Sequence, residues 1–168
     1  MVAVRTLIAN HKQPSQPPTN PGEVVGVPPI FKWRNLVTRE NRIPFSHLLS
    51  TCDELEDAET LGAYESALSI LGSIHNAIAN AEPPYALARR LVSFPMYVPT
   101  KFVDLVDEQR PRALVILAHY FFLLQRQEFL WWINNIPRRE IQAIQRVLSP
   151  EWQDLIREPV VAAARAPL

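Results

Sequence analysis

The stretch that decides the fold is residues 110–158, RPRALVILAHYFFLLQRQEFLWWINNIPRREIQAIQRVLSPEWQDLIRE. On a helical wheel, the segment from Ala113 to Leu124 is apolar on every side except for His119 and the hydroxyl of Tyr120. A helix of this kind must be surrounded by other elements. The segment is therefore predicted to form a buried central helix.

Two prolines set the predicted limits of this helix. Pro111 suits the first turn, where its missing N–H costs nothing, and Pro137 prevents the helix from continuing. The predicted helix runs over about residues 112–133. It is not a membrane span, because a bilayer requires about 20 predominantly apolar residues and this run meets the polar residues Gln125–Glu128 first.

Several segments spread over residues 60–160 match one family pattern in order and in spacing. They are RPRALVILAHY at 110–120, Leu123-Leu124, Trp131-Trp132, PEW at 150–152, Pro159, AYESALSIL at 63–71 and SFPMYVPTKFVDLV at 93–106. Together they resemble the C-terminal end of fungal zinc-binuclear-cluster transcription regulators, and within that class the sterol uptake control group. The chain departs from the family in having INNIP at 133–137 in place of a Gly-Trp-Gly-like turn, and in having no DNA-binding module.

The resemblance implies a helical region that holds a hydrophobic ligand and mediates self-association. With the apolar central helix, it predicts a ligand-sensing and protein-interaction domain for an apolar small molecule such as a sterol or terpenoid. No cofactor is expected. The residues expected to line the pocket are Tyr64, Leu68, Leu71, Met96, Phe102, Leu117, Phe121 and Trp132.

Composition limits the classes of function. Of 168 residues, 48% are hydrophobic and 20% charged, a balance that allows one domain with its own core. The 17 basic and 17 acidic residues cancel, so the chain should not bind DNA directly. A single cysteine, Cys52, excludes an internal disulfide and any zinc site built from several thiolates. An intracellular protein of the nucleus or cytoplasm is expected.

The predicted organisation is a proline-rich arm or linker at residues 1–30, an all-α domain at 31–160 and a tail at 161–168. Six of the 16 prolines lie between Pro14 and Pro29, which prevents both helix and strand there. Whether this segment is a docking arm or a disordered tail stays open. No alternating run predicts a strand elsewhere, so the fold class is a single bundle-like helical domain around the central helix.

A long helix is predicted before the central one. Ser50 or Thr51 can cap it, four acidic residues follow in its first turns, and Pro83 stops it. Gly62 and Gly72 inside it suggest the close approach of another backbone or of a ligand, although tolerated glycines are common.

A short helix is then expected at 85–92, followed by an extended or turning segment at 94–99 because of two prolines four residues apart. After the central helix, Pro137 begins a helix with an apolar face formed by Ile141, Ile144, Val147 and Leu148.

The end of the chain predicts a last helix and self-association. Ser149 and Pro150 begin this helix, which carries Trp152, Leu155 and Ile156. These apolar groups either close the core or stay partly uncovered and join two chains, and in the second case a twofold dimer is predicted.

No pair of the four histidines has the spacing of a helical metal site, so no metal is expected. His119 is either a core histidine that bonds a carbonyl or carboxylate, or a polar group in a ligand pocket.

The alternative function is an enzyme of secondary metabolism that cyclises or isomerises an apolar substrate by positioning it. In that case His119, Tyr120 or Glu128 would transfer the proton.

Overall fold

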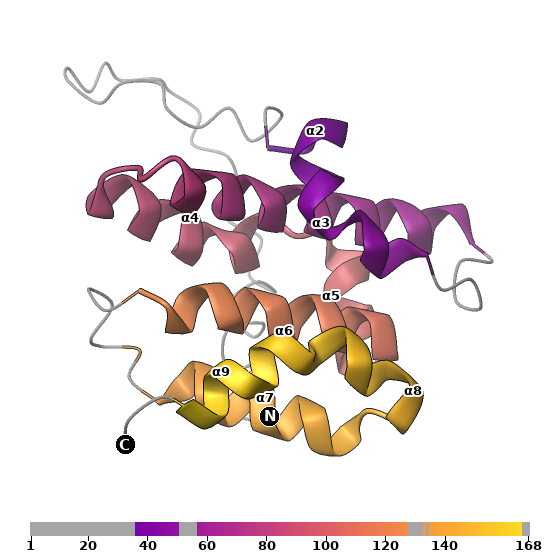
Figure 1. The fold of residues 1–168 in the computed structure, drawn as a ribbon. Coiled ribbons are helices and arrows are strands. Elements are labelled where there is room, and N and C mark those ends of the chain that lie inside the picture. The colour runs from indigo at the N-terminus through magenta and orange to yellow at the C-terminus, as the bar shows by residue number, and fades with distance from the viewer. Residues whose placement is uncertain (1–35, 51–56, 128–132, 134, 166–168) are drawn as a thin grey trace.

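The structure, a computed structural model, describes residues 36–50, 57–127, 133 and 135–165. These parts of the chain are helical and contain no strand, which confirms the all-α prediction. In Figure 1, α6 (Pro111–Gln125) lies between a layer formed by α3 and α4 and a layer formed by α7 and α9. The other elements are α2 (Arg39–Arg42), η2 (Ile43–Leu49), α3 (Ala58–Ala79), α4 (Pro84–Tyr97), α5 (Thr100–Asp107), α7 (Ile136–Val147), α8 (Pro150–Gln153), η3 (Asp154–Ile156) and α9 (Arg157–Arg165).

The helix α6 is the buried centre of the domain, as its apolar circumference predicts. Every residue from Arg112 to Leu124 is buried. The predicted end near residue 133 is wrong, because α6 ends at Gln125, where the sequence turns polar and Gln127 closes a turn onto the carbonyl of Leu124 at 3.1 Å. Residues 128–132, and with them the paired tryptophans, lie outside the described part of the chain.

The helix α3 begins later than predicted. Asp57 caps it by accepting hydrogen bonds from the backbone N–H groups of Glu59 and Thr60, at 3.0 and 3.1 Å. The first of these bonds is the main cause of the lowered pKa of the Asp57 carboxyl. The predicted capping residues are wrong, since Ser50 ends η2 and Thr51 lies outside the described residues. An aspartate accepting two N–H groups is the stronger cap.

The two glycines of α3 have different environments. A Cβ on Gly72 would lie 1.6 Å from the carbonyl oxygen of Asn41, so the α2 backbone packs directly on α3 at this position. A Cβ on Gly62 would meet nothing within 4 Å. The predicted close approach of another backbone is therefore confirmed at Gly72 and wrong at Gly62.

The helix α4 continues five residues beyond Val92, the end predicted from the sequence, and contains Pro95. The prediction of an extended or turning segment at 94–99 is therefore wrong for residues 94–97, whereas Val98 has an extended backbone. Pro95 has no N–H for the carbonyl of Leu91, but the hydroxyl of Tyr120 donates a hydrogen bond to that carbonyl at 3.0 Å. The tertiary contact therefore satisfies the acceptor that the proline leaves without its helical partner.

The C-terminal elements pack against α6 on the side opposite α3. In α7, Ile141 and Ile144 are buried as predicted, whereas Val147 is 46% exposed and does not join the apolar face. Helix α9 extends through five residues of the predicted tail and buries Ala163. None of the described helices is long and apolar enough to cross a membrane.

Candidate functional site

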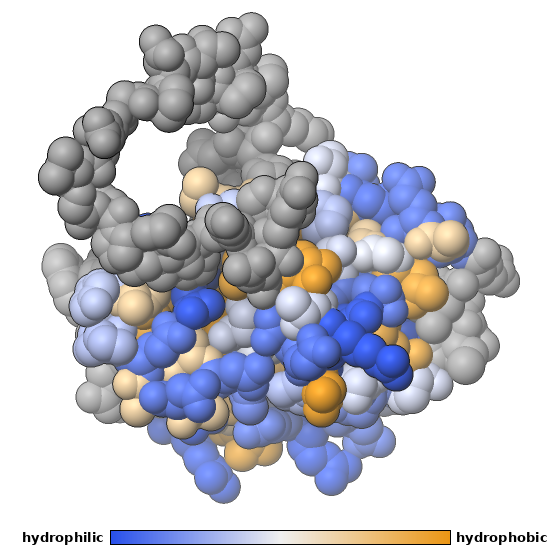
Figure 2. All heavy atoms as spheres, turned by 90° about the horizontal axis from the view of Figure 1, so that it is seen from above, coloured by the Kyte–Doolittle hydropathy of each residue, from blue (hydrophilic) through white to orange (hydrophobic). Residues whose placement is uncertain are grey.

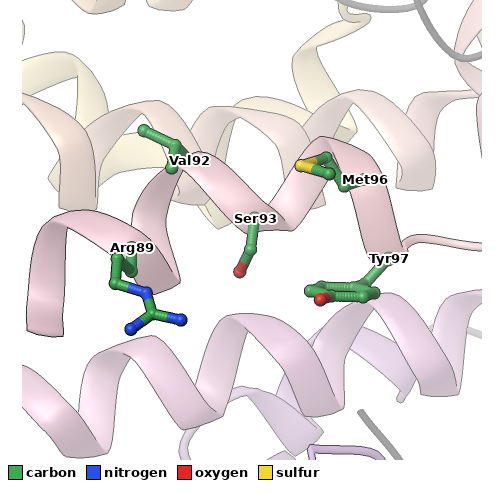
Figure 3. Close-up of a pocket in the computed structure, with 5 residues that line it drawn as sticks. All are labelled: Arg89, Val92, Ser93, Met96 and Tyr97. Atoms are coloured by element: carbon green, nitrogen blue, oxygen red, sulfur yellow. The ribbon is translucent and has the colours of Figure 1, made fainter. Parts of the chain in front are cut away.

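A small pocket lies on the surface of α4. It has a volume of about 210 Å³ and is lined by Arg89, Val92, Ser93, Met96 and Tyr97. Figure 3 shows the side chains of Arg89, Ser93 and Tyr97 extending from α4 toward the neighbouring helix, with Val92 and Met96 on the other side of the ribbon. The pocket is therefore lined by two apolar side chains and by three that carry polar groups.

The same helix exposes an apolar row. Tyr85, Val92 and Met96 are 69%, 47% and 65% exposed, and their spacing of seven and four residues places them on one face of α4. The space-filling view in Figure 2 shows a surface that is mostly hydrophilic with small separate apolar patches. Two residues of this row, Val92 and Met96, also line the pocket.

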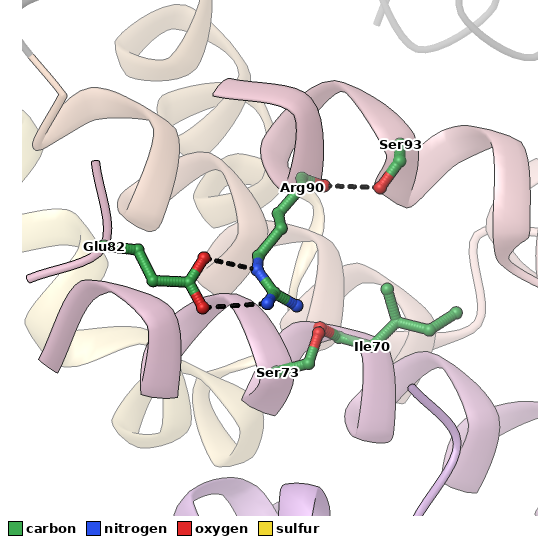
Figure 4. Close-up of polar contacts among 5 residues, drawn as sticks. All are labelled: Ile70, Ser73, Glu82, Arg90 and Ser93. Carbon is green, nitrogen blue, oxygen red and sulfur yellow. Dashed lines mark hydrogen bonds and ion pairs between the residues drawn. The ribbon is translucent and has the colours of Figure 1, made fainter. Parts of the chain in front are cut away.

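Polar contacts lie within α3, within α4 and in the connection between these two helices. Arg90 forms a two-pronged ion pair with Glu82, with two N–O distances of 2.8 Å (Figure 4). Ser93 donates to the carbonyl of Arg90 at 2.7 Å, and Ser73 of α3 donates to the carbonyl of Ile70 at 2.7 Å. The bidentate pair therefore joins α4 to the connection that precedes it.

The eight residues predicted to line a ligand pocket fall into three sets. Met96 lines the α4 pocket, and Trp132 lies outside the described residues. The other six lie in the hydrophobic core with exposures of 7% or less: Tyr64, Leu68, Leu71, Phe102, Leu117 and Phe121. Within this group, the rings of Tyr64 and Phe102 contact edge to face at 6.5 Å. The sequence missed Arg89, Val92, Ser93 and Tyr97, although the helical spacing from Tyr85 to Met96 could have indicated a shared face.

His119 is a core histidine with a backbone partner. Its Nε2 lies 2.9 Å from the carbonyl oxygen of Leu155, and since a carbonyl only accepts, Nε2 carries the proton. Burial is the main cause of the lowered pKa of His119, opposed by the hydrogen bond to Leu155. The neutral imidazole therefore serves as a donor that joins α6 to η3.

Tyr120, the next residue of α6, donates a hydrogen bond to α4. Its hydroxyl bonds the carbonyl of Leu91, and its ring stacks on Phe94 with centroids 4.3 Å apart. Burial raises the pKa of the hydroxyl well above its usual range. Glu128, the third residue considered for proton transfer, lies outside the described residues.

The sequence reading missed a fully buried cation. Arg112, in the first turn of α6, has no exposed surface, and its Nη1 donates to the carbonyl of Leu48. Its guanidinium carbon lies 5.2 Å from the ring centroid of Trp152 and 5.9 Å from that of Tyr64. Arg112 therefore joins η2, α3, α6 and α8. The sequence signal for this burial was that Arg112 is a basic residue in the first turn of an otherwise apolar helix.

The apolar residues on which the dimer was predicted are used within the chain. Ile156 is fully buried, and Trp152 and Leu155 pack partly buried against the core.

In the described part of the chain no group of three or more His, Cys, Asp and Glu residues is arranged to hold a metal ion.

Comparison with known proteins identifies relatives of one kind. The chain is 32% identical over 166 residues to a Zn(2)-C6 fungal-type transcription factor of Gibberella zeae, a match that covers 94% of this chain and 32% of that protein. It is 39% identical over 87 residues to the Zn(2)-C6 fungal-type transcription factor afumD of Aspergillus fumigatus, covering 51% of this chain and 23% of that protein.

No family model and no solved structure matches the chain. The matched part of the chain corresponds to about a third or less of the length of each of the two transcription factors. Over most of its own length it is similar to one part of a Zn(2)-C6 fungal-type transcription factor.

Proposed function

We propose that this chain acts as the regulatory region of a fungal transcription regulator, in the nucleus or cytoplasm, and that DNA contact is made by other residues or by a partner. The similarity to part of a transcription factor supports this over 94% of the chain. A Zn₂Cys₆ cluster takes its ligands from several cysteines, and this sequence contains one. The formal net charge of zero gives no general attraction for phosphates. A salt-dependent gel shift by the isolated chain at submicromolar concentration would contradict the proposal.

The regulatory signal we propose is an apolar small molecule of the sterol or terpenoid class, bound at the α4 pocket. The observation that carries this proposal is the position of the pocket beside Val92 and Met96, which are exposed at 47% and 65%. Its 210 Å³ is below the range of about 300–1,000 Å³ typical of complete small-molecule sites, so it takes one end of such a ligand. Arg89, Ser93 and Tyr97 supply polar groups for a hydroxyl or carboxyl at that end.

The chain offers a matched pair of variants for the test. Val92 and Val147 are 47% and 46% exposed, on α4 and α7 respectively, and only Val92 lines the pocket. With a sterol and farnesol as probes, Val92→Asp should weaken binding at least about tenfold, whereas Val147→Asp should leave it unchanged. Thermal shift and native mass spectrometry measure this. Equal affinities in both variants, or no binding by the unchanged chain, would overturn the α4 proposal.

The core residues predicted from the sequence define a second location for the ligand. A sterol among Leu68, Leu117 and Phe121 would require α3 and α6 to separate, because these side chains are at most 7% exposed. Loss of binding in Phe121→Ala with retention in Val92→Asp would place the ligand there. A shift of the unfolding temperature of the free chain serves as the control for damage to the core.

The described geometry gives the enzyme alternative no support, because His119 and Tyr120 both hold backbone carbonyls of neighbouring elements. A twofold dimer through the C-terminal elements stays a prediction, in which the partly buried Trp152 and Leu155 would contribute and the fully buried Ile156 would not. Sedimentation at tens of micromolar measures this directly.

A further inference from the structure

Two rows of side chains run next to each other along the outside of α7. One row is apolar: Ile136 at the start of the helix is 38% exposed, Val147 at its end is 46% exposed, and the small, half-buried Ala143 lies between them. Their spacing of seven and four residues places these three on one face. The other row consists of Arg139 and Arg146, which are exposed and seven residues apart. We refer to these five residues as the α7 face.

The fold of the described residues does not use the α7 face. Helix α7 packs on α6 and α9 through other positions, among them the buried Ile141 and Ile144. Within the described parts of the chain, Arg139 and Arg146 form no ion pair. Glu140, the only acidic residue of α7, is 4% exposed, so the exposed charge of this helix is entirely positive.

The arrangement of the two rows is what indicates a partner. Single exposed apolar residues and solvated arginines are each ordinary on a protein surface. Here Ile136 and Val147 lie about 16 Å apart along the helix axis, with a small residue between them and the basic row alongside. A second helix can therefore lie along α7, with its backbone close to Ala143 and its apolar side chains on Ile136 and Val147.

The charge of the α7 face decides which helix fits it. Arg139 and Arg146 lie about 10 Å apart along the axis, the distance between two carboxylates seven residues apart on a facing helix. A nucleic acid is a poorer fit, because Ile136 and Val147 would be covered by a charged, hydrated backbone and the chain has a formal net charge of zero. An acidic amphipathic helix satisfies both rows at once.

We propose that the α7 face is a docking surface for an acidic amphipathic helix of a partner protein. The apolar row receives the apolar residues of that helix, and the two arginines pair with its carboxylates. In Figure 1, α7 lies on the side of α6 opposite to α4, so this surface is separate from the α4 pocket. The interaction stands whether or not the pocket binds a ligand.

The test uses the full chain and two synthetic helical peptides. Both carry leucine at positions i, i+4, i+7 and i+11 and alanine on the outer side, and the positions beside the leucine row are glutamate in one peptide and lysine in the other. In NMR titrations at about 50 mM salt, the glutamate peptide should bind at least about tenfold more tightly than the lysine peptide and shift the amide signals of α7. At about 500 mM salt this preference should fall below about threefold.

Three results of these titrations would overturn the proposal: equal affinities of the two peptides, shifts mainly outside α7, or no binding of the glutamate peptide at about 1 mM. Controls with duplex DNA, with phosphatidylserine vesicles and with the chain alone address other occupants. Tighter binding of DNA or vesicles to α7, or self-association lost in Arg139→Glu with Arg146→Glu, would also overturn it.

Reversal of the two charges tests the basic row. In Arg139→Glu with Arg146→Glu the preference should invert, so that the lysine peptide binds at least about tenfold more tightly. Arg39→Glu with Arg110→Glu makes the same change of net charge at exposed arginines of other segments and should leave the original preference intact. An unchanged preference in the α7 variant, or an inverted one in the control, would contradict the docking surface.

A matched pair of valines tests the apolar row. Val147→Asp should weaken binding of the glutamate peptide at least about tenfold, because an aspartate in the row opposes both the leucines and the carboxylates. Val37, which is 41% exposed and precedes α2, provides the control, and Val37→Asp should change the affinity less than about twofold. Equal effects of the two substitutions would show that the apolar row is not part of the contact.

Discussion

The hydroxyl of Tyr120 donates a hydrogen bond of 3.0 Å to the carbonyl oxygen of Leu91, which lies four residues before Pro95. The adjacent residue His119 does the same for Leu155, which lies four residues before Pro159. For Leu91 the helical N–H partner is missing because Pro95 occupies its position, whereas Leu155 lies in the 3₁₀ helix η3. Two consecutive residues of α6 therefore donate to carbonyls of two different elements.

Replacement of Tyr120 by Phe should lower the free energy of unfolding by about 1–3 kcal/mol, because the buried carbonyl of Leu91 loses its donor. In a Pro95→Ala background the cost should be smaller, since the substituted alanine can supply the helical N–H. A double-mutant cycle from urea denaturation measures the coupling. Identical costs in the two backgrounds would show that the hydroxyl and the proline are energetically independent.

Stability should fall on acidification through His119. Its pKa in the folded chain lies below the ordinary value, so between that lowered value and about 6.5 the unfolded chain binds more protons. The contribution is therefore complete above about pH 6.5 and is lost as the pH falls through the folded pKa. His119→Gln should flatten this dependence in denaturation midpoints measured from about pH 7.5 to about pH 5. A slope as steep as that of the unchanged chain would assign the dependence to other groups.

The two glycines of α3 should respond in opposite directions to alanine. Gly72→Ala places a Cβ against the Asn41 carbonyl and should destabilise the chain by about 2 kcal/mol or more, since backbone must move. Gly62→Ala meets open space and should stabilise it by about 0.5–1 kcal/mol through helix propensity. Thermal unfolding of both variants provides the measurement, and the same sign in both would contradict the packing of α2 on α3.

Arg112→Lys should destabilise the chain by about 2 kcal/mol or more, because an ammonium group cannot reproduce the cation–π contact with Trp152 together with the hydrogen bond to Leu48. Arg126 is the matched control: its guanidinium lies 5.4 Å from the Phe122 ring centroid, but the residue is exposed. Arg126→Lys should cost less than about 0.5 kcal/mol. Chemical denaturation followed by tryptophan fluorescence compares them.

The sequence by itself determined the all-α class and the buried central helix. A run that is apolar around a whole helical turn has no stable position except inside other helices, and this follows from composition alone. The start of α6 at Pro111 and the end of α3 before Pro83 follow equally from the geometry of proline. The family resemblance followed from the residues at 110–120 and their spacing.

Only the tertiary structure decided where proline does not end a helix. Pro95 predicted an extended segment because a prediction from local sequence considers only the backbone N–H that the proline lacks. The donor that replaces this N–H is the hydroxyl of Tyr120, 25 positions later in the chain. The burial of Arg112 and the exposure of Met96 are decided in the same way, by which side chains other elements bring to them. Local propensity carries no information about such partners, because they are neighbours in space and not in sequence.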